Sequence, residues 1–146
     1  MFRTVAGTTE VLLVHPGGPL WARKDQGAWS IPKGEFADGE DPFQAALREF
    51  NEEMGGPVDG TFIALQPRRQ AGGKTVYAWA VRSEFDPSRL GNATFSMEWP
   101  PRSGRQQTFL EIDRAAWFPL DVARFKILKG QVGFLDELER TLTHTE

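Results

Sequence analysis

The sequence predicts a single α/β domain, residues 1–146, in which helices cover both faces of a mixed β-sheet in an α/β/α sandwich. The first observation is the order of the apolar patterns, which reads strands, helix, strands, helix. The second is size, because 146 residues with 40% hydrophobic content suffice for one compact core. The third is that no internal repeat is visible.

The N-terminal segments predict a hairpin of two strands. Residues 2–5 alternate in polarity, residues 6–9 form a turn, and residues 10–15 read as a buried strand closed by the Pro/Gly-rich segment 16–19. The first strand is shorter than its partner, which leaves the far end of the second strand without a pairing partner. Two explanations stay open: a short first strand, or a natural chain that starts upstream of Met1.

The next element is a helix with clear start and stop signals. Asp41 is suited to the N-cap and Pro42 to the first helical position, while Gly55 supplies a left-handed stop after Met54. Within it, three acidic residues at positions i, i+3 and i+4 share one face. They are Glu49, Glu52 and Glu53, and a separate apolar stripe docks the helix on the core.

The remaining chain predicts further strands and two closing helical segments. Expected strands are 60–65, 74–81, 94–99 and 115–118, with a hairpin turn at 70–73, a polar loop at 84–93 and a Pro-stiffened basic loop at 100–105. A short helix is expected to follow Pro119 and to end near Gly130. The closing helix spans about 131–142, with its apolar residues on one side.

Three like charges on adjacent turns repel one another, by roughly 0.2–0.5 kcal/mol for each exposed pair. A cation would offset this repulsion, and carboxylate oxygens suit hard divalent ions such as Mg²⁺ or Mn²⁺. A zinc site is not expected, because the chain has no cysteine and its two histidines, His15 and His144, lie far apart in the sequence.

The segment Gly34 to Gly56 resembles the Nudix box, GX5EX7REUXEEXGU with U aliphatic. Its fixed positions are occupied by Gly34, Glu40, Arg48, Glu49, Glu52, Glu53 and Gly55. Two positions depart from the pattern, since Phe50 and Gly56 stand where aliphatic residues are usual. The stretch Trp117 to Asp121, ahead of a helix, is also similar to the C-terminal part of this family. The resemblance implies a Nudix-type α/β/α sandwich.

The resemblance also implies roles for individual residues. Glu49, Glu52 and Glu53 would bind the metal together with the carbonyl group of Gly34, and one of the three glutamates would orient the attacking water. Glu40 and Arg48 would form a structural pair. Members of the family often carry a further acidic ligand or base before the last strand. Glu111 is the candidate, with Asp113 and Glu98 as alternatives.

Four residues are candidates for substrate binding. Trp29 to Gly34 resembles the W-x-x-P-K-G stretch of Nudix hydrolases that act on nucleoside polyphosphates, and there Lys33 would neutralise phosphate charge. Arg102 and Arg105, in the Pro/Gly-framed loop, could bind phosphate as bidentate donors or be simply exposed. Trp29 is a candidate for base stacking, with core packing as the alternative. The cluster of Arg68, Arg69 and Lys74 reads as a solvated face.

The resemblance to the Nudix family implies Mg²⁺-dependent hydrolysis of a diphosphate linked to another moiety in a phosphorylated small molecule, with a nucleoside or dinucleoside polyphosphate favoured over ADP-ribose or a sugar nucleotide. A nucleotide-sensing module without activity is the non-enzyme alternative, but all three box carboxylates are present. The net charge of −3 argues against a general nucleic-acid partner. The apolar runs are too short to span a bilayer, and the lack of cysteines fits a reducing cytoplasm.

Overall fold

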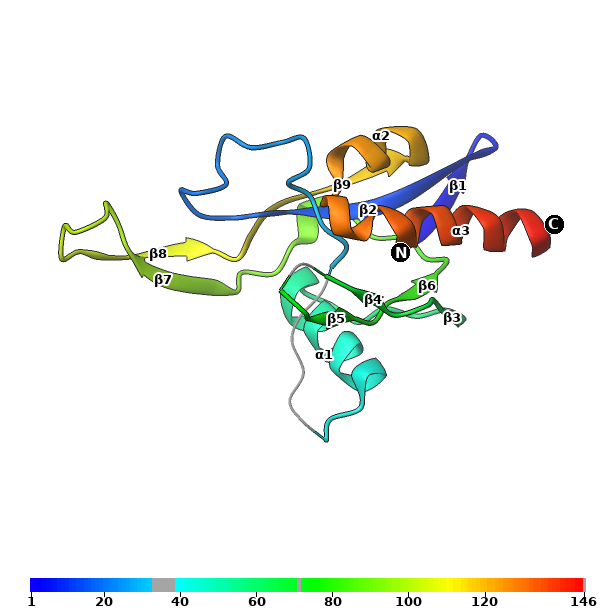
Figure 1. The fold of residues 1–146 in the computed structure, drawn as a ribbon, viewed down its shortest axis with the longest axis horizontal. Coiled ribbons are helices and arrows are strands. Elements are labelled where there is room, and N and C mark those ends of the chain that lie inside the picture. The colour runs from blue at the N-terminus through cyan, green and yellow to red at the C-terminus, as the bar shows by residue number, and fades with distance from the viewer. Residues whose placement is uncertain (33–38, 71, 146) are drawn as a thin grey trace.

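The computed structural model describes residues 1–32, 39–70 and 72–145. Figure 1 shows the order of the elements along the chain. The strands are β1 (Phe2–Val5), β2 (Thr8–Pro16), β3 (Phe62–Ala64), β4 (Arg68–Arg69), β5 (Thr75–Val76), β6 (Trp79–Val81), β7 (Thr94–Glu98), β8 (Gln106–Leu110) and β9 (Ile112–Pro119). The α-helices are α1 (Pro42–Met54), α2 (Leu120–Lys126) and α3 (Val132–Thr145), with short 3₁₀ turns η1 (Pro87–Arg89) and η2 (Lys129–Gln131).

The central sheet is mixed, as expected. Strand β2 lies between β1 and β9 and is antiparallel to both. On the other side of β1, a parallel bridge joins Phe2 to Arg82, and Ser83 donates a backbone hydrogen bond of 3.1 Å to the carbonyl of Phe2. This contact attaches the antiparallel pair of β3 and β6 to the central strands.

The alternating direction of the side chains along β2 explains why helices pack on both faces of the sheet. Val11 and Leu13 point into a core cluster that includes Ala123 of α2, Ile127 directly after α2, and Leu135 and Leu138 of α3. Leu12 and Val14 point to the opposite face, where they pack in a second cluster with Met54 and Phe50 of α1. Successive side chains of a strand face opposite sides, so apolar residues at every position bury the sheet on both faces. The predicted α/β/α arrangement is confirmed.

Helix α1 begins and ends as the sequence predicts. The Asp41 side chain caps it by accepting a hydrogen bond of 3.1 Å from the Gln44 backbone N–H, and Pro42 is its first residue. Gly55 ends the helix in the left-handed conformation, with φ of 76°. Phe43 anchors the helix to the sheet through edge contacts with Phe62 and Trp79.

The structure corrects three expectations. The far end of β2 does not lack a partner, because Val14 and Ser30 exchange two backbone hydrogen bonds of 2.8 and 2.9 Å. Strand β8 was not expected, and β9 begins at Ile112 instead of near residue 115. The segment predicted as one strand over 74–81 is divided into β5 and β6.

Strands β7 and β8 form a separate two-stranded hairpin, with Phe95 opposite Phe109. Figure 1 shows this hairpin extending away from the rest of the molecule, on the side opposite to the C-terminal end of α3. The helices within the described residues include none with the length and apolar character needed to cross a membrane.

Candidate active site

Helix α1 carries the three glutamates on the face that turns away from its apolar stripe. Glu52 is exposed, while Glu49 and Glu53 are partly buried. Because they are spaced at i, i+3 and i+4, their side chains project from adjacent turns. One oxygen of Glu53, Oε2, is buried. The sequence alone predicts this face, since the caps of α1 and its apolar residues fix the rotation of the helix.

Arg48, in the middle of α1, links the helix to the segment before it and contacts one of the three glutamates. Its guanidinium group donates one hydrogen bond to Oε2 of Glu40 and a second, of 3.1 Å, to Oε1 of Glu49. These hydrogen bonds, with Glu49 contributing most, raise the pKa of Arg48 above its ordinary value. The pairing of Glu40 with Arg48 that the sequence resemblance implies is therefore present, and it connects the segment before α1 to one of the three glutamates.

The other end of α1 is fixed by the segment that follows η1. The backbone N–H of Gly91 donates a hydrogen bond of 3.0 Å to the carbonyl oxygen of Glu53. A Cβ atom at position 91 would lie 2.6 Å from the carbonyl oxygen of Glu52 and 2.8 Å from that of Glu53. Only a glycine can approach the last turn of α1 this closely. Sequence reasoning missed this residue, because a single glycine in a polar loop carries no pattern.

Glu111 lies between β8 and β9, close to this end of α1. Its backbone N–H donates to the carbonyl of Ala93 (2.9 Å), and its own carbonyl accepts from the N–H of Gly17 (2.9 Å). The next residue, Ile112, is buried in the same core cluster as Met54 of α1. Backbone hydrogen bonds thus connect the end of α1, the segment 91–93, Glu111 and the loop after β2. Glu111 is exposed at this junction.

Comparison with known proteins decides the family. The profile of the NUDIX domain matches residues 2–138 of the chain. The chain belongs to the Nudix family.

Similarity to individual Nudix proteins is local in sequence and extensive in structure. An RNA pyrophosphohydrolase of Ectopseudomonas mendocina is 50% identical over 46 residues, which are 31% of this chain and 29% of that protein. Nudix hydrolase 25 of Arabidopsis thaliana is 59% identical over 29 residues, 20% of this chain and 17% of that protein. The chain therefore matches less than a third of the length of these relatives.

Two solved structures share the fold along nearly the whole chain. A C. elegans Ap4A hydrolase, solved as a binary complex, superposes with a TM-score of 0.65 at 22% identity, covering 98% of this chain and 94% of that one. The NUDIX domain of Shewanella oneidensis NrtR, solved with ADP ribose, has a TM-score of 0.61 at 16% identity and covers 97% and 82%. At these identities the likeness shows the fold.

Three of the candidate substrate residues of this Nudix domain are described, and the structure does not bring Trp29 together with Arg102 and Arg105. Lys33 and Gly34 lie outside the described residues. Arg102 and Arg105 lie in the turn of the β7–β8 hairpin, which Figure 1 shows projecting away from α1. Trp29 is buried, with 3% of its surface exposed, and donates its indole N–H to Asp25 over 2.8 Å. His15 and Phe118 cover its ring, so the core alternative is correct and base stacking by Trp29 is not.

The two alternative acids are engaged elsewhere in the Nudix fold. Asp113 lies 2.8 Å from Nδ1 of the buried His15, whose Nε2 contacts the carbonyl oxygen of Lys24 at 2.6 Å. Glu98 accepts a hydrogen bond of 2.7 Å from the backbone N–H of Arg102 at the hairpin turn. His15 therefore ties the loop after β2 to β9. The sequence offered only a hint of this role, a polar residue at the end of an apolar strand.

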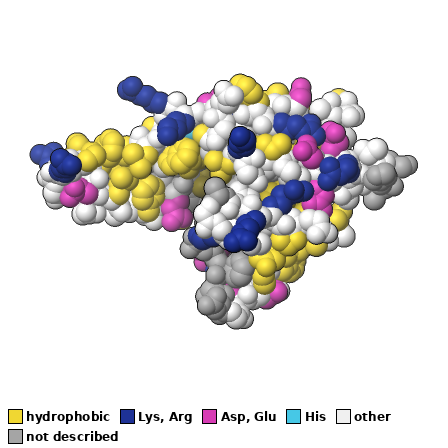
Figure 2. All heavy atoms as spheres, in the orientation of Figure 1, with side chains coloured by type: hydrophobic (Ala, Val, Ile, Leu, Met, Phe, Trp, Pro, Cys, Tyr) yellow, Lys and Arg dark blue, Asp and Glu magenta, His cyan; other side chains and the backbone are white. Residues whose placement is uncertain are grey.

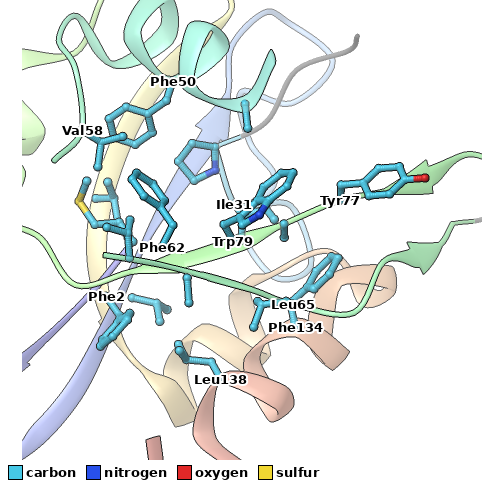
Figure 3. A pocket seen from close by; sticks show the side chains of 18 of the residues that line it. Phe2, Ile31, Phe50, Val58, Phe62, Leu65, Tyr77, Trp79, Phe134 and Leu138 are labelled. Atoms are coloured by element: carbon cyan, nitrogen blue, oxygen red, sulfur yellow. The ribbon is translucent and has the colours of Figure 1, made fainter. Parts of the chain in front are cut away.

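An apolar cavity of about 110 Å³ lies behind α1. Figure 3 shows side chains from α1, the sheet and α3 pointing toward one another, including Phe50, Phe62, Trp79 and Leu138. Tyr77 and Trp79 carry the polar N–H and O–H side-chain groups among the described residues that line it, and none of these side chains is charged. A phosphorylated substrate would find no charged side chain in this cavity, so the carboxylate face of α1 is the better candidate for chemistry.

A charge cluster predicted as solvated is partly packed. The guanidinium group of Arg68 lies 3.5 Å from Oε1 of Glu137 and stacks over the ring of Phe134, both on α3. Gly133 leaves room for this contact, because a Cβ atom there would lie 2.4 Å from Nη1 of Arg68. Arg69 and Lys74 are exposed, as expected. Arg68 therefore attaches β4 to the closing helix.

Proposed function

We propose that this Nudix domain hydrolyses a pyrophosphate bond in a nucleoside diphosphate linked to another moiety, with a nucleoside or dinucleoside polyphosphate as the favoured substrate. The observation that carries the proposal is the carboxylate face of α1. Glu49, Glu52 and Glu53 project from adjacent turns. The pair of Arg48 and Glu40 ties the helix to the preceding segment, and Gly91 holds its last turn.

The donor set fits Mg²⁺, with Mn²⁺ as an alternative. Among the described residues, no group of three or more His, Cys, Asp or Glu side chains is arranged so that it could hold a metal ion, so the three glutamates do not form a complete site by themselves. Mg²⁺ does not need three protein ligands, because it keeps several waters and is usually bound by one or two carboxylates together with substrate phosphates. When bound, Mg²⁺ would screen the phosphate oxygens and lower the pKa of the attacking water.

The residues of the chain supply position and proton transfer. A carboxylate of Glu49, Glu52 or Glu53 accepts a hydrogen bond from the attacking water and removes its proton as the bond to phosphorus forms. Arg48 keeps Glu49 oriented by the hydrogen bond to Oε1. Lys33 would balance charge on the leaving phosphate as a mobile cation. Such transfers depend mostly on positioning and charge stabilisation.

Support for the proposed substrate class comes from the family and from the names of similar proteins. The related proteins include an RNA pyrophosphohydrolase and an Ap4A hydrolase, and the NrtR domain was solved with ADP ribose. Nucleoside polyphosphates remain favoured here because the Trp29 to Gly34 segment matches the W-x-x-P-K-G stretch. ADP-ribose, sugar nucleotides and a 5′-phosphorylated RNA are the alternative substrates, and the assay described next distinguishes them.

The test is phosphate or pyrophosphate release from a panel of nucleoside triphosphates, dinucleoside polyphosphates, ADP-ribose, UDP-sugars and 5′-triphosphorylated RNA. Each is assayed with millimolar Mg²⁺ and with EDTA. We expect Mg²⁺-dependent release from at least one nucleoside or dinucleoside polyphosphate. Nucleotide binding without any release, under every condition, would favour the sensing module and overturn the proposed hydrolysis.

A further inference from the structure

A second cleft lies between the loop after β2 and the β7–β8 hairpin, and Glu111 is among the residues that line it. It has a volume of about 290 Å³, close to the lower end of ordinary ligand pockets. One wall is the loop after β2 and the other is the β7–β8 hairpin. The lining residues are Pro16, Gly17, Gly18, Pro19, Leu20, Trp21, Phe95, Met97 and Glu111. Figure 2 shows hydrophobic side chains gathered along the arm that the hairpin forms.

Two glycines allow the loop to approach the hairpin. A Cβ atom at Gly17 would lie 1.9 Å from the carbonyl oxygen of Leu110, and one at Gly18 would lie 2.7 Å from Cζ of Phe95. Gly18 also has a positive φ of 96°, which favours glycine. The spacing of the two walls therefore depends on glycine at both positions, since larger residues there would force the walls apart.

The walls suit a flat aromatic ring. Phe95 and Met97 present a ring and a polarisable thioether from β7, and Trp21 lies on the loop side. Stacking between a nucleobase and an aromatic side chain stabilises binding and tolerates any base, because every base has a π-face. The volume holds one base and not an extended chain. The ammonium group of Lys24 lies 4.9 Å from the centre of the Trp21 ring, which places a cation beside the cleft.

Glu111 is the one charged residue among the described residues that line the cleft. An ionised carboxylate only accepts hydrogen bonds, and it has two oxygens for two parallel donors. Guanine presents two adjacent donors on one edge, N1–H and the N2 amino group. Adenine presents one amino group beside an acceptor nitrogen, and uracil presents one N–H between two carbonyl groups.

We propose that this cleft binds the base of the substrate nucleotide and that Glu111 makes it prefer guanine. The inference rests on the proposed function and names the substrate class of that site. It assigns Glu111 to recognition of the base, in place of the acid–base role that the sequence suggested. The backbone hydrogen bonds from Glu111 to Ala93 and from Gly91 to Glu53 connect the segment that lines the cleft to the last turn of α1. In the proposed complex, the phosphates of the bound nucleotide extend from the cleft toward the carboxylate face of α1.

The test measures binding of methylene-bridged, non-hydrolysable analogues of GTP, ITP and ATP by calorimetry, in the presence of Mg²⁺. We expect the GTP analogue to bind about 10- to 100-fold more tightly than the ATP analogue, since a bidentate pair discriminates at that level. The ITP analogue lacks the N2 amino group and should bind with intermediate affinity. Glu111→Gln should bring the three affinities within about threefold of one another, because the amide replaces an acceptor by a donor.

Two further variants keep the test decisive. Met97→Ala should weaken all three analogues alike, because it removes a wall and leaves Glu111 in place. Glu84→Gln is the matched control: Glu84 is an exposed glutamate paired with Arg3 (3.1 Å) on β1, and its change should preserve the preference. Thermal melts verify that each variant is folded. Equal affinities in the wild type, or a preference that survives Glu111→Gln, would overturn the proposal.

The two proposals can fail separately. A guanine preference without hydrolysis of any panel member would leave the cleft assignment standing and remove the enzymatic one. Hydrolysis at equal kcat/KM for guanine and adenine substrates would leave the enzyme and remove the base preference. Loss of hydrolysis in Glu111→Gln with the binding preference intact would return Glu111 to the chemical step.

Discussion

The backbone N–H of Gly91 donates its hydrogen bond to the carbonyl oxygen of Glu53, over 3.0 Å. Glu53 is thus held through its main chain by one residue while its side chain belongs to the carboxylate face of α1. The last carbonyl groups of a helix have no partner within the helix, so Gly91 supplies one from outside. The position of the proposed metal ligands therefore depends on the loop around Gly91, although Gly91 itself has no side chain to bind a metal or a substrate.

Replacing Gly91 by alanine should destabilise the protein and lower its turnover. The added Cβ atom would lie 2.6 and 2.8 Å from the carbonyl oxygens of Glu52 and Glu53, so the segment must move away from α1. Overpacking of this kind costs roughly 1–3 kcal/mol. Urea unfolding and kcat measure the two effects. Gly56→Ala is the control, because a Cβ atom there meets nothing within 4 Å. Equal stabilities of the two variants would contradict the predicted contact.

Glu52→Gln and Glu53→Gln should each lower turnover by orders of magnitude and leave the fold intact. Each substitution removes a ligand charge from the carboxylate face and creates no cavity, so stability without metal should hold or rise. Steady-state kinetics with the best panel substrate gives the loss, and Glu84→Gln provides a glutamate outside the site. A variant that keeps more than about a tenth of wild-type turnover, a loss below about 1.4 kcal/mol in the barrier, would show that the ligand assignment is wrong.

Millimolar Mg²⁺ should raise the Tm of the wild-type protein. A metal that binds the folded carboxylate face and not the unfolded chain stabilises the folded state by mass action. Differential scanning calorimetry with and without a non-hydrolysable nucleotide measures the shift. The double variant Glu52→Gln/Glu53→Gln should lose it. If the wild type shows no shift in either condition, the proposed metal site is not supported.

Stability should rise with pH between about 6 and 8 in a protein whose chain begins at Met1. Burial lowers the pKa of its amino group from 8.0 to about 6, although the residue as a whole is only half-buried. Between these values the unfolded chain holds a proton that the folded chain has lost, so raising the pH favours folding. Two pKa units correspond to roughly 3 kcal/mol. Urea unfolding from pH 5.5 to 8.5 tests this.

A variant extended by a few residues before Met1 is the control for the pH dependence. Its α-amino group lies elsewhere, so the rise of stability between about pH 6 and 8 should become much smaller. The same rise in both proteins would assign the pH dependence to another group.

Local signals in the sequence predicted the bounds of α1 correctly and, with them, the face on which its three glutamates lie. Asp41, Pro42 and Gly55 determine where the helix begins and ends, and each acts through neighbours within four residues. Pairings between residues that lie far apart in the sequence were harder to predict. The contact of Ser30 with Val14 joins segments sixteen positions apart and leaves no periodic pattern, so the end of β2 was expected to be unpaired.

Strand β8 was missed because its residues are mostly polar and exposed. Gln106, Gln107 and Thr108 show no alternation of apolar and polar residues. They form a strand because their backbone groups pair with those of β7 in an antiparallel ladder. That same register places the turn with Arg102 and Arg105 at the far end of the hairpin. The two arginines were candidates for phosphate binding on sequence grounds, but sequence does not show how far a hairpin projects.

The hairpin leaves the body of the protein and returns to it at two residues that are hydrogen-bonded to each other, Ala93 and Glu111. Because this base is closed, the distance between the two attachment points does not depend on the length of the strands or on their turn. The arm can therefore be lengthened, shortened or exchanged for that of another family member without disturbing α1. Such an exchange would transplant one wall of the cleft as a module, and the catalytic helix would stay where it is.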